Sequence, residues 1–535
     1  MKENTSIARG MIVLSIAGIL VKVLSILYTP ALKSILTTAG YGIYTQTTQV
    51  FVFVYAIACM GAQPALAKVV SEYTAVGKHK SAVRALSIAR KVFMTVGVIL
   101  ALLLIVLAVP IARLAKNPDI AYGIVALAPC IVITTYLATI RGYMQGKNNM
   151  KSIAISQIIE QITNIAVSLF FAFILVKISL QSGNAGAQIG TSAAALIASI
   201  YLLFIFIKNK YKHNSIEEDT GKTQSDRKIT RKILAYSFPI ILSAGLQNFG
   251  GVIDTFNVSN RLVFAGFDEK SMQVLVGYSG MYNALYGVPI VIITAVAMSI
   301  LPAISKLFVL KDMKETRRKI RETFKLTYII AIPAAVGLSV LSKDIYISLF
   351  GSDEGSSLMA IGAFIIILMA TTQIQASVLQ SINKMYYMLG AFMIGLTLKV
   401  ILNYIFVGMP SINIYGVLIG NFFWQAIPVV FNHRKICKTM KMKLPVIRLV
   451  ARPALASLLM ALTIYIIQLP YSVIYRFVSP SRITSIPITV VAVIAGGFVY
   501  LYMMIVTGGI RKNDLEAISP KIIRILPRFI RKKLR

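Results

Sequence analysis

Charged residues, acidic ones above all, are scarce in this sequence of 535 residues. Only 14% of the residues are charged and 57% are hydrophobic, and the mean hydropathy is +0.76. A water-soluble chain of this length would need far more charged surface, so the composition excludes an ordinary soluble protein and indicates a membrane protein. The remaining charge is lopsided: 55 Lys and Arg oppose 19 Asp and Glu, a formal net charge of +36.

Cysteine is also scarce. Cys59 and Cys130 lie in apolar runs, and Cys437 lies in a basic loop. An odd, scattered set of three excludes a disulfide framework and a zinc site. The first apolar run, residues 11–32, is too long for the core of a signal peptide, so we expect a first membrane helix there.

Histidine and nucleotide-binding motifs are equally sparse. The three histidines fall in predicted cytoplasmic loops, which excludes an intramembrane histidine acting as acid, base or metal ligand: His79, His213 and His433. The segment 221–223 reads Gly-Lys-Thr but lacks the upstream glycine of a phosphate-binding loop. ATP-driven chemistry within this chain is therefore not expected, and we predict no cofactor.

Long apolar runs are abundant. A bilayer core about 30 Å thick needs about 20 apolar residues per helix, and fourteen stretches meet that length. The sequence therefore predicts an all-α polytopic membrane protein. The predicted spans are 10–32, 41–66, 92–112, 120–140, 152–176, 186–207, 233–259, 274–304, 326–350, 357–382, 387–408, 412–432, 450–469 and 485–507.

The basic residues follow the segments between these spans. With a cytoplasmic N-terminus, 44 of the 55 Lys and Arg lie in or near inside segments, 9 lie in or near outside segments, and Lys22 and Lys399 lie deeper within helices. Such an excess predicts that both termini are cytoplasmic. It also explains the net charge through topology, so we expect no nucleic-acid partner.

An internal repeat is indicated by matching residues in the two halves. Pro64-Ala65 recurs as Pro302-Ala303, 238 residues later, and Glu160 and Asn164 are matched by Lys399 and Asn403 after 239. A repeat of six helices gives parallel copies, as in transporters. The predicted parts are two parallel six-helix lobes at 1–207 and 233–435, a linker at 208–232, two C-terminal helices in 436–510 and a basic amphipathic tail at 511–535.

Four of the charged residues within the predicted spans are candidates for function. Glu160 and Asp254 are acidic, and Lys22 and Lys399 are basic, so their charges sum to zero. Intramembrane charges are costly and are functional candidates by default. They can instead be structural ion pairs between helices, Glu160 with Lys399 and Lys22 with Asp254, and the sequence leaves both interpretations open.

Polar residues form stripes on several predicted helices. On helix five they are Gln157, Glu160, Gln161 and Asn164, at helical spacing, and other helices contribute Asn283 and Gln373. The pattern predicts a hydrated cavity suited to a sugar-rich substrate, with Lys22 and Arg261 attracting a phosphate. Asp254, Lys399 and Glu160 are the predicted charge-pair residues. The last two helices form either an apolar groove for a lipid tail or accessory packing.

Several segments resemble a known family. Residues 141–150 read RGYMQGKNNM and residues 156–164 read SQIIEQITN; the segments GGVIDTFNVSNRL at 250–262 and VPIVIITAVAMSILPAISK at 288–306 add weaker matches. Together they resemble the MOP exporter superfamily, in its polysaccharide biosynthesis branch with stage V sporulation protein B and MurJ-like flippases. Lys22 occupies the place of the first-helix arginine of that family, and Thr29 that of a second basic residue.

The resemblance implies a flippase rather than an enzyme. It implies two six-helix lobes around a cationic cavity, a lipid-tail groove in the last two helices, and alternating access. The implied substrate is an undecaprenyl-pyrophosphate-linked sugar, lipid II or a related cell-wall or polysaccharide precursor, moved from the inner to the outer leaflet of a bacterial cell membrane. Membrane potential or an ion gradient would drive it, and cell-wall or polysaccharide synthesis enzymes would be its partners.

Two rival functions stay open at this point. A drug or cation antiporter of the same superfamily would favour an acidic cavity and twelve helices. A membrane-bound polysaccharide-assembly enzyme would need an acidic or histidine catalytic cluster, which the sequence does not show.

Overall fold

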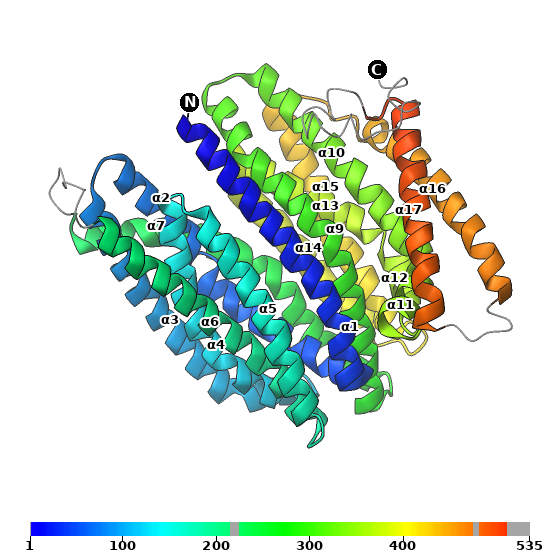
Figure 1. The fold of residues 1–535 in the computed structure, drawn as a ribbon. Helices are drawn as coiled ribbons and strands as arrows, with labels where there is room; N and C mark the ends of the chain where they lie inside the picture. Colours follow the sequence, from blue (N-terminus) through cyan, green and yellow to red (C-terminus); the bar gives the residue numbers. More distant parts are fainter. Residues whose placement is uncertain (1, 214–223, 475–480, 511–535) are drawn as a thin grey trace. The chain divides into compact units, whose positions relative to one another are not determined.

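The computed structural model describes residues 2–213, 224–474 and 481–510 (Figure 1). Within these residues the chain is all-α and forms no strand. The predicted tail at 511–535 lies outside the described residues, and so do residues 214–223 of the predicted linker at 208–232. The helices are α1 (Lys2–Cys59), α2 (Ala62–Ala75), α3 (His79–Leu114), α4 (Ile120–Gly146), α5 (Met150–Leu175), α6 (Leu180–His213), α7 (Asp226–Ile253), a π-helical turn (Asp254–Val258), α8 (Ser259–Phe264), α9 (Glu269–Val309), α10 (Met313–Val340), α11 (Ser342–Phe350), α12 (Ser356–Gly362), α13 (Ile365–Ser381), α14 (Met385–Phe406), a 3-10 turn (Asn413–Tyr415), α15 (Gly416–Met440), α16 (Val446–Ile474) and α17 (Arg482–Val506).

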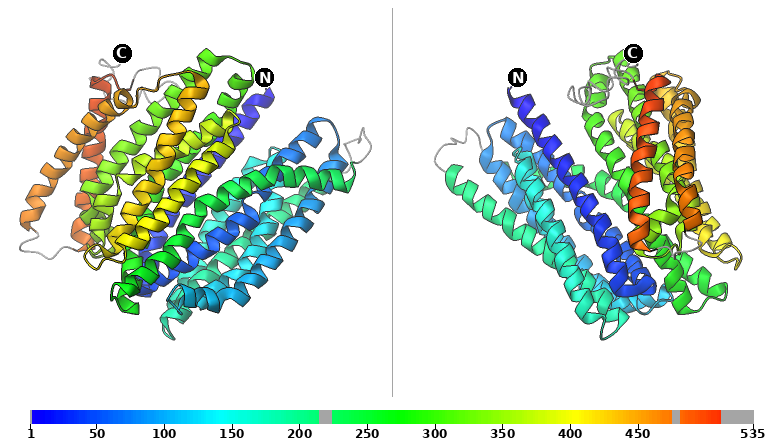
Figure 2. Two further views of the ribbon diagram at one scale, coloured as in Figure 1. Left: turned by 180° about the vertical axis from the view of Figure 1, so that it is seen from behind. Right: turned by 45° about the vertical axis from the view of Figure 1, so that its right-hand side comes forward.

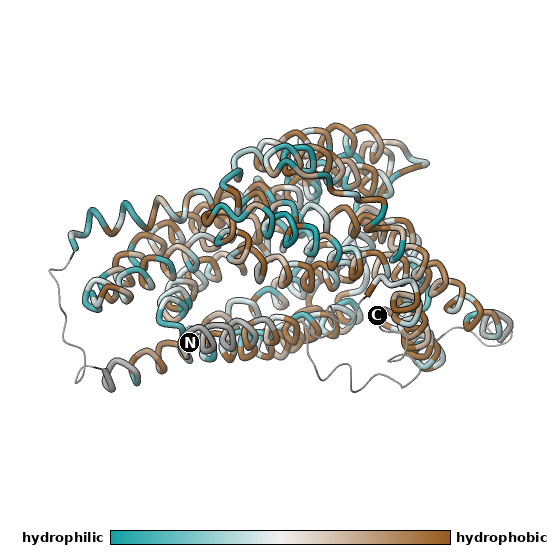
Figure 3. The backbone as a smooth tube through the Cα atoms, turned by 90° about the horizontal axis from the view of Figure 1, so that it is seen from above, coloured by the Kyte–Doolittle hydropathy of each residue, from teal (hydrophilic) through white to brown (hydrophobic). Residues whose placement is uncertain are grey.

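Most of these helices are long and apolar, and long stretches of the chain are hydrophobic (Figure 3). In the described part of the chain, 12 helical stretches are long and apolar enough to cross a membrane, or 13 if the bent pair α12 and α13 makes one span. The first stretch, Ile16–Ala75, has 60 residues. At about 1.5 Å per residue, this stretch is more than long enough to cross a bilayer core twice. It therefore covers two of the predicted spans. The total then reaches the predicted fourteen, and the all-α polytopic fold is confirmed.

The division between the first two spans lies inside α1. Thr37 interrupts the helix with φ 66° and ψ 176°, outside the helical region. Threonine is β-branched and rarely adopts positive φ, so the surrounding packing must hold this break in place. Leu36 beside it is completely buried. The break lies between the spans predicted at 10–32 and 41–66.

Positive-φ residues close equivalent turns in the two halves of the chain. They pair as Thr37 with Gly266, Gly77 with Lys311, Lys116 with Gly351, and Asn148 with Asn383. The separations of these pairs are 229, 234, 235 and 235 residues. Each residue lies between helices that follow one another in the same order, and a residue with positive φ commonly marks the end of a helix. The order of these turns agrees with the repeat predicted from the sequence, which stays a prediction.

By packing, the chain divides into two compact units. Unit 1 comprises Met1–Gly280 and Val400–Val417, and unit 2 comprises Met281–Lys399 and Leu418–Arg535. The divisions fall inside α9, about two turns before the end of α14 and at the start of α15. Helices α7 and α8 and the first turns of α9 therefore pack with the first six spans. The predicted lobes at 1–207 and 233–435 describe the sequence repeat and stay a prediction.

Unit 1 has a large apolar core shared by α1 to α7. Its members include Leu66, Ile124 and Ile131, each at most 1% exposed. Helices α5 and α6 pack closely, as do α3 and α4 (Figure 1). Gly186 and Gly190 face α5: a methyl group on Gly186 would lie 2.7 Å from the Phe171 carbonyl oxygen. Small residues at this spacing let membrane helices approach closely.

A buried chain of amides also holds unit 1 together. Gln46 of α1 donates to Ser259 and accepts a hydrogen bond from Asn117 at 2.5 Å. Gln273 of α9 donates to Asn117 at 3.1 Å and to Asp119 at 2.9 Å. Buried polar groups need such partners, so this network fixes α1, α8 and α9 against the turn before α4.

Unit 2 contains the last two helices, α16 and α17, which lie side by side (Figure 2). Met460, Ile464 and Tyr500 contribute to their shared apolar core. The Tyr500 hydroxyl donates to the Ile329 carbonyl of α10 at 2.7 Å, which fastens α17 to that helix. The pair is thus packed into unit 2 through α10 and α11.

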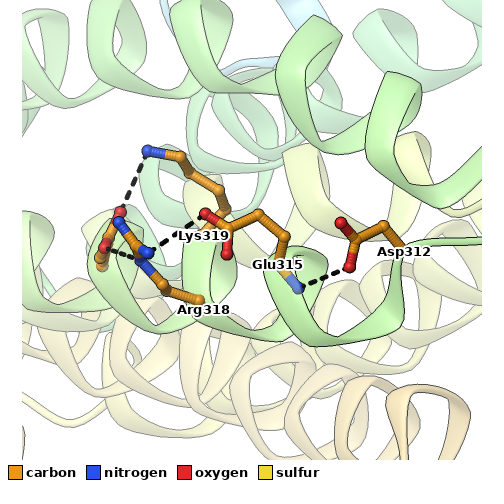
Figure 4. A network of polar contacts seen from close by, with 5 residues as sticks. Asp312, Glu315, Arg318 and Lys319 are labelled. Atoms are coloured by element: carbon orange, nitrogen blue, oxygen red, sulfur yellow. Dashed lines mark hydrogen bonds and ion pairs between the residues drawn. The ribbon is translucent and has the colours of Figure 1, made fainter. Parts of the chain in front are cut away.

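The start of α10 is basic, but acidic neighbours partly neutralise it (Figure 4). The Asp312 side chain caps the helix by accepting from the Glu315 backbone N–H at 3.0 Å. Arg318 lies 3.4 Å from Glu315 and 3.0 Å from Glu322, and Lys319 lies 3.1 Å from Glu322. Such exposed pairs contribute little to stability.

Candidate functional site

The polar stripe predicted on helix five lies on α5 of unit 1. The helix starts where Asn149 caps it, its side chain accepting from the Ser152 backbone N–H at 3.3 Å. From there the three- and four-residue spacing places the polar side chains on one face. All four predicted residues are half-buried: Gln157, Glu160, Gln161 and Asn164.

These four residues line one cavity of about 270 Å³ within unit 1. The other walls come from α1, α4 and α6. They are Gly18, Val21, Arg141, Thr191 and Ala194. The cavity is slightly smaller than typical sites for drug-sized ligands, which measure roughly 300–1,000 Å³.

An ion pair crosses the cavity wall between α4 and α5. The Arg141 Nη2 atom lies 2.6 Å from the Glu160 Oε2 atom, and Arg141 Nε donates to the Ser156 hydroxyl at 3.1 Å. The Arg141 side chain is 10% exposed and that of Glu160 30%. Glu160 therefore has Arg141 as its ion-pair partner in unit 1.

Arg141 is the site residue that sequence reasoning missed. The predicted fourth span ends at residue 140, which leaves Arg141 in a predicted cytoplasmic loop, whereas α4 continues to Gly146. The available signal was the motif RGYMQGKNNM, which begins with this arginine. With Arg141 included, the charged groups lining the cavity are one cation and one anion.

The amides in the cavity differ in how firmly they are held. Asn164 Oδ1 accepts from the hydroxyls of Ser168 at 2.9 Å and Thr191 at 3.5 Å, and this leaves its NH₂ group for other acceptors. Over the ranges that the structure describes, the side chains of Gln157 and Gln161 have no hydrogen-bond partner. The cavity thus offers unoccupied donors and acceptors beside one oriented amide.

Lys22 lies on α1, one turn after Gly18, and helical spacing places the two on the same face. Gly18 and Val21 both line the cavity, so Lys22 belongs to the helix surface that borders it. Its side chain is half-buried, and it has no ion-pair partner in the part of the chain that the structure describes. A half-buried, uncompensated ammonium group is available for an anion.

Asp254 begins the π-helical turn between α7 and α8. Its Oδ1 atom accepts from Asn403 Nδ2 at 2.9 Å. It borders a second, very small cavity of about 10 Å³, together with Gln46, Gln49 and Thr255. π-turns inside helices are frequent at functional sites, but this space has room for little more than one water molecule.

Arg261 is tied to the end of α14. Its Nε atom donates to the Tyr404 carbonyl oxygen at 2.8 Å, and its guanidinium lies 4.1 Å from the Tyr404 ring and 3.9 Å from the Phe264 ring. The last carbonyls of a helix lack partners within it and favour a cation. These contacts describe a helix cap, so they do not support the predicted phosphate role of Arg261.

The remaining predicted residues belong to unit 2. Lys399 is 1% exposed and its Nζ atom lies 4.5 Å from the centre of the Trp424 ring. Asn283 of α9 and Gln373 of α13 are half-buried. Among the described residues, no group of three or more His, Cys, Asp or Glu is placed to hold a metal ion.

Comparison with known proteins decides the family. Residues 7–308 match the family model described as polysaccharide biosynthesis protein. The chain belongs to this family. It is 27% identical to the uncharacterized membrane protein YabM of Bacillus subtilis (strain 168), over 95% of this chain and 94% of the relative. It is 24% identical to the lipid II flippase MurJ of the same organism, over 99% of both chains.

Solved structures show the same fold. The lipid II flippase MurJ in its inward closed conformation aligns with a TM-score of 0.66, at 19% identity, over 92% of this chain and 98% of that chain. An inward-facing MATE family transporter of the MOP superfamily aligns at 0.63, with 14% identity, over 80% and 99%. The resemblance to the MOP superfamily and its MurJ-like branch is confirmed, and the chain is a multi-pass membrane protein.

Proposed function

We propose that this chain is a flippase that moves a lipid-linked sugar precursor from the inner to the outer leaflet. The precursor would be an undecaprenyl-pyrophosphate-linked sugar, lipid II or a related cell-wall or polysaccharide precursor, in the membrane of a bacterial cell. The observation that carries the proposal is the amide-lined cavity of unit 1, in a member of the polysaccharide biosynthesis protein family. A sugar hydroxyl group both donates and accepts hydrogen bonds, and an amide side chain can supply the matching acceptor or donor.

The proposed roles follow the chemistry of each side chain. Gln157, Gln161 and Asn164 bind sugar hydroxyl groups, and Lys22 attracts the diphosphate at the border of the cavity. Asn283 and Gln373 of unit 2 would contact the substrate at another stage of transport. Alternating access would expose the substrate to each leaflet in turn, with Asp254 and Lys399 exchanging partners between states.

The proposed orientation places both termini in the cytoplasm, following the basic residues of the predicted inside segments. Membrane lipids and the enzymes that make the precursor would then meet the chain at the inner leaflet. We propose transport without covalent chemistry on the substrate, and coupling to the membrane potential or to an ion gradient.

A MATE-like drug or cation antiporter is the second candidate, since its fold is shared. An organic cation needs an uncompensated acidic group in the cavity, whereas the carboxylate of Glu160 already pairs with Arg141. The lipid-linked sugar fits these contacts better.

Leaflet exchange in proteoliposomes tests the proposal. The purified full chain is reconstituted with lipid II, with other undecaprenyl-linked glycans, and with a fluorescent organic cation under an imposed proton gradient. Exchange of a lipid-linked glycan supports the proposal. Cation transport without glycan exchange supports the antiporter instead.

Lys22 gives the first variant for this assay. Because its ammonium has no ion-pair partner in the described chain, Lys22→Ala leaves no buried acid unpaired, and we expect slower exchange with unchanged thermal stability. Lys22→Arg, which keeps the charge, is the matched control and should retain exchange. Loss of folded protein in Lys22→Ala would mean that the lysine is structural.

A further inference from the structure

If the chain transports lipid-linked sugars as proposed above, the charge balance of the unit 1 cavity affects which sugars the cavity accepts. The inference below rests on that proposed function. Arg141 and Glu160 are the charged residues lining the cavity, and they neutralise one another at 2.6 Å. The seven other lining residues are uncharged. A carboxylated sugar entering this space would bring a negative charge that no free cation of the wall compensates.

The pair still has unused hydrogen-bonding groups. Arg141 uses Nε for Ser156 and Nη2 for Glu160, so its Nη1 group keeps two donors. Glu160 uses Oε2, so its Oε1 atom remains an acceptor. One side of the cavity thus presents donors and an acceptor without net charge, which suits hydroxyl and acetamido groups.

The free amides lie beside the pair on the same face of α5. Gln157 and Gln161 have no partner within the described ranges, and Asn164 is oriented by Ser168 and Thr191. From Gln157 to Asn164 the helix rises by about 10 Å. The cavity volume is about 270 Å³, close to the lower end for sites of small ligands. These dimensions suit a single sugar ring with its substituents better than a longer glycan.

We propose that the Arg141–Glu160 pair is a specificity determinant that admits an uncharged sugar, such as an N-acetylhexosamine, and disfavours a uronic acid at this position. Lys22 borders the cavity on α1, so the diphosphate lies outside the neutral space while the adjoining sugar enters it. The charge of the diphosphate and the neutrality of the sugar are then recognised by different groups.

The test compares two probes in proteoliposomes containing the full chain. One is an undecaprenyl diphosphate carrying N-acetylglucosamine, and the other is the same lipid carrying glucuronic acid. The measured quantity is the ratio of acidic-probe to neutral-probe exchange rates. We expect the wild-type chain to prefer the neutral probe.

Two single variants should move this ratio in opposite directions. Glu160→Gln leaves the arginine uncompensated, so the ratio should rise at least about tenfold, the scale of one charge-assisted hydrogen bond. Arg141→Gln leaves the carboxylate, so the ratio should fall. The double variant Arg141→Gln with Glu160→Gln restores neutrality and should return the ratio to near the wild-type value. General destabilisation cannot produce opposite shifts.

Glu72→Gln is the matched control, because Glu72 forms an ion pair with Lys232 elsewhere in unit 1. It should leave the ratio unchanged. Equal exchange of both probes by the wild-type chain, or shifts in the same direction in both single variants, would overturn the inference while leaving the flippase proposal intact. If neither probe nor lipid II is exchanged, the proposed function itself fails.

Discussion

Arg141 shows how one side chain sets the electrostatics of a membrane cavity. Its guanidinium is nearly buried and is held by Ser156 and Glu160, which come from the next helix. Taking one charge into a membrane interior is costly, and a partner at ion-pair distance offsets much of that cost. The arginine therefore stabilises unit 1 and shapes the cavity through the same contacts.

Removing one member of this pair should destabilise the fold. Glu160→Gln leaves a nearly buried guanidinium without its carboxylate, and losses of about 3–5 kcal/mol are typical for such changes. We expect a lower thermal midpoint in detergent, with partial recovery when Arg141→Gln is added. If the single variant unfolds at the wild-type temperature, the ion pair contributes nothing to stability.

Arg261 offers a clear choice between two roles at the residue scale. If it caps α14 through the Tyr404 carbonyl, Arg261→Ala should lower the thermal midpoint in the absence of any substrate. Arg261→Lys, which keeps the charge but loses the planar ring contacts, should recover only part of the loss. An unchanged midpoint combined with lost transport would instead favour the phosphate role predicted from the sequence.

At the scale of helices, α5 and α6 form the framework of the cavity. Their close approach depends on Gly186 and Gly190, where an added methyl group would overlap Phe171 and Ser168. Ser168 in turn donates to Asn164, so the packing of the two helices also orients an amide of the cavity. Helix packing and site geometry are thus coupled.

Alanine at Gly186 or Gly190 should therefore separate the two helices. Overpacking of this kind costs about 1–3 kcal/mol, and the reorientation of Asn164 should also slow transport. Gly390→Ala on α14 is the matched control, since a methyl group there meets nothing within 4 Å and alanine favours a helix. Thermal midpoints of the three variants check this prediction. Equal midpoints would show that the glycines are not required for packing.

The helices were more predictable from sequence than the site. Hydrophobic length alone predicts the fourteen spans, because each span must cross the same bilayer thickness. Helical spacing places Gln157, Glu160, Gln161 and Asn164 on one face of α5. The partner of Glu160 was not predictable in this way: it depends on where α4 ends, and the polar end of a membrane helix leaves no sharp hydrophobic signal.

At the scale of the whole chain, the repeat and the topology are linked. Four pairs of equivalent positive-φ turns follow the same helix order in both halves. Six spans in each half return the chain to the same side, so corresponding turns of the two halves should face the same compartment. This sidedness can be tested without any assumption about transport.

Cysteine labelling tests directly on which side of the membrane the predicted turns lie. Lys177 and Lys311 are both exposed; the first lies in a predicted outside turn and the second in a predicted inside turn. In intact cells an impermeant maleimide should label Lys177→Cys and should label Lys311→Cys only after permeabilisation. Cys59 and Cys130 are buried, and Cys437, in a predicted inside loop, is replaced by serine in the background. The reverse pattern would invert the proposed orientation.

We propose that this chain carries a lipid-linked sugar across the membrane through the unit 1 cavity. The most direct measurement is the rate of leaflet exchange of lipid II or another undecaprenyl-linked glycan in proteoliposomes, comparing the wild-type chain with Gln157→Ala/Gln161→Ala. We expect exchange well above that of protein-free vesicles for the wild type, and a large loss in the folded double variant. An absence of exchange of every lipid-linked glycan by folded wild-type protein would contradict it.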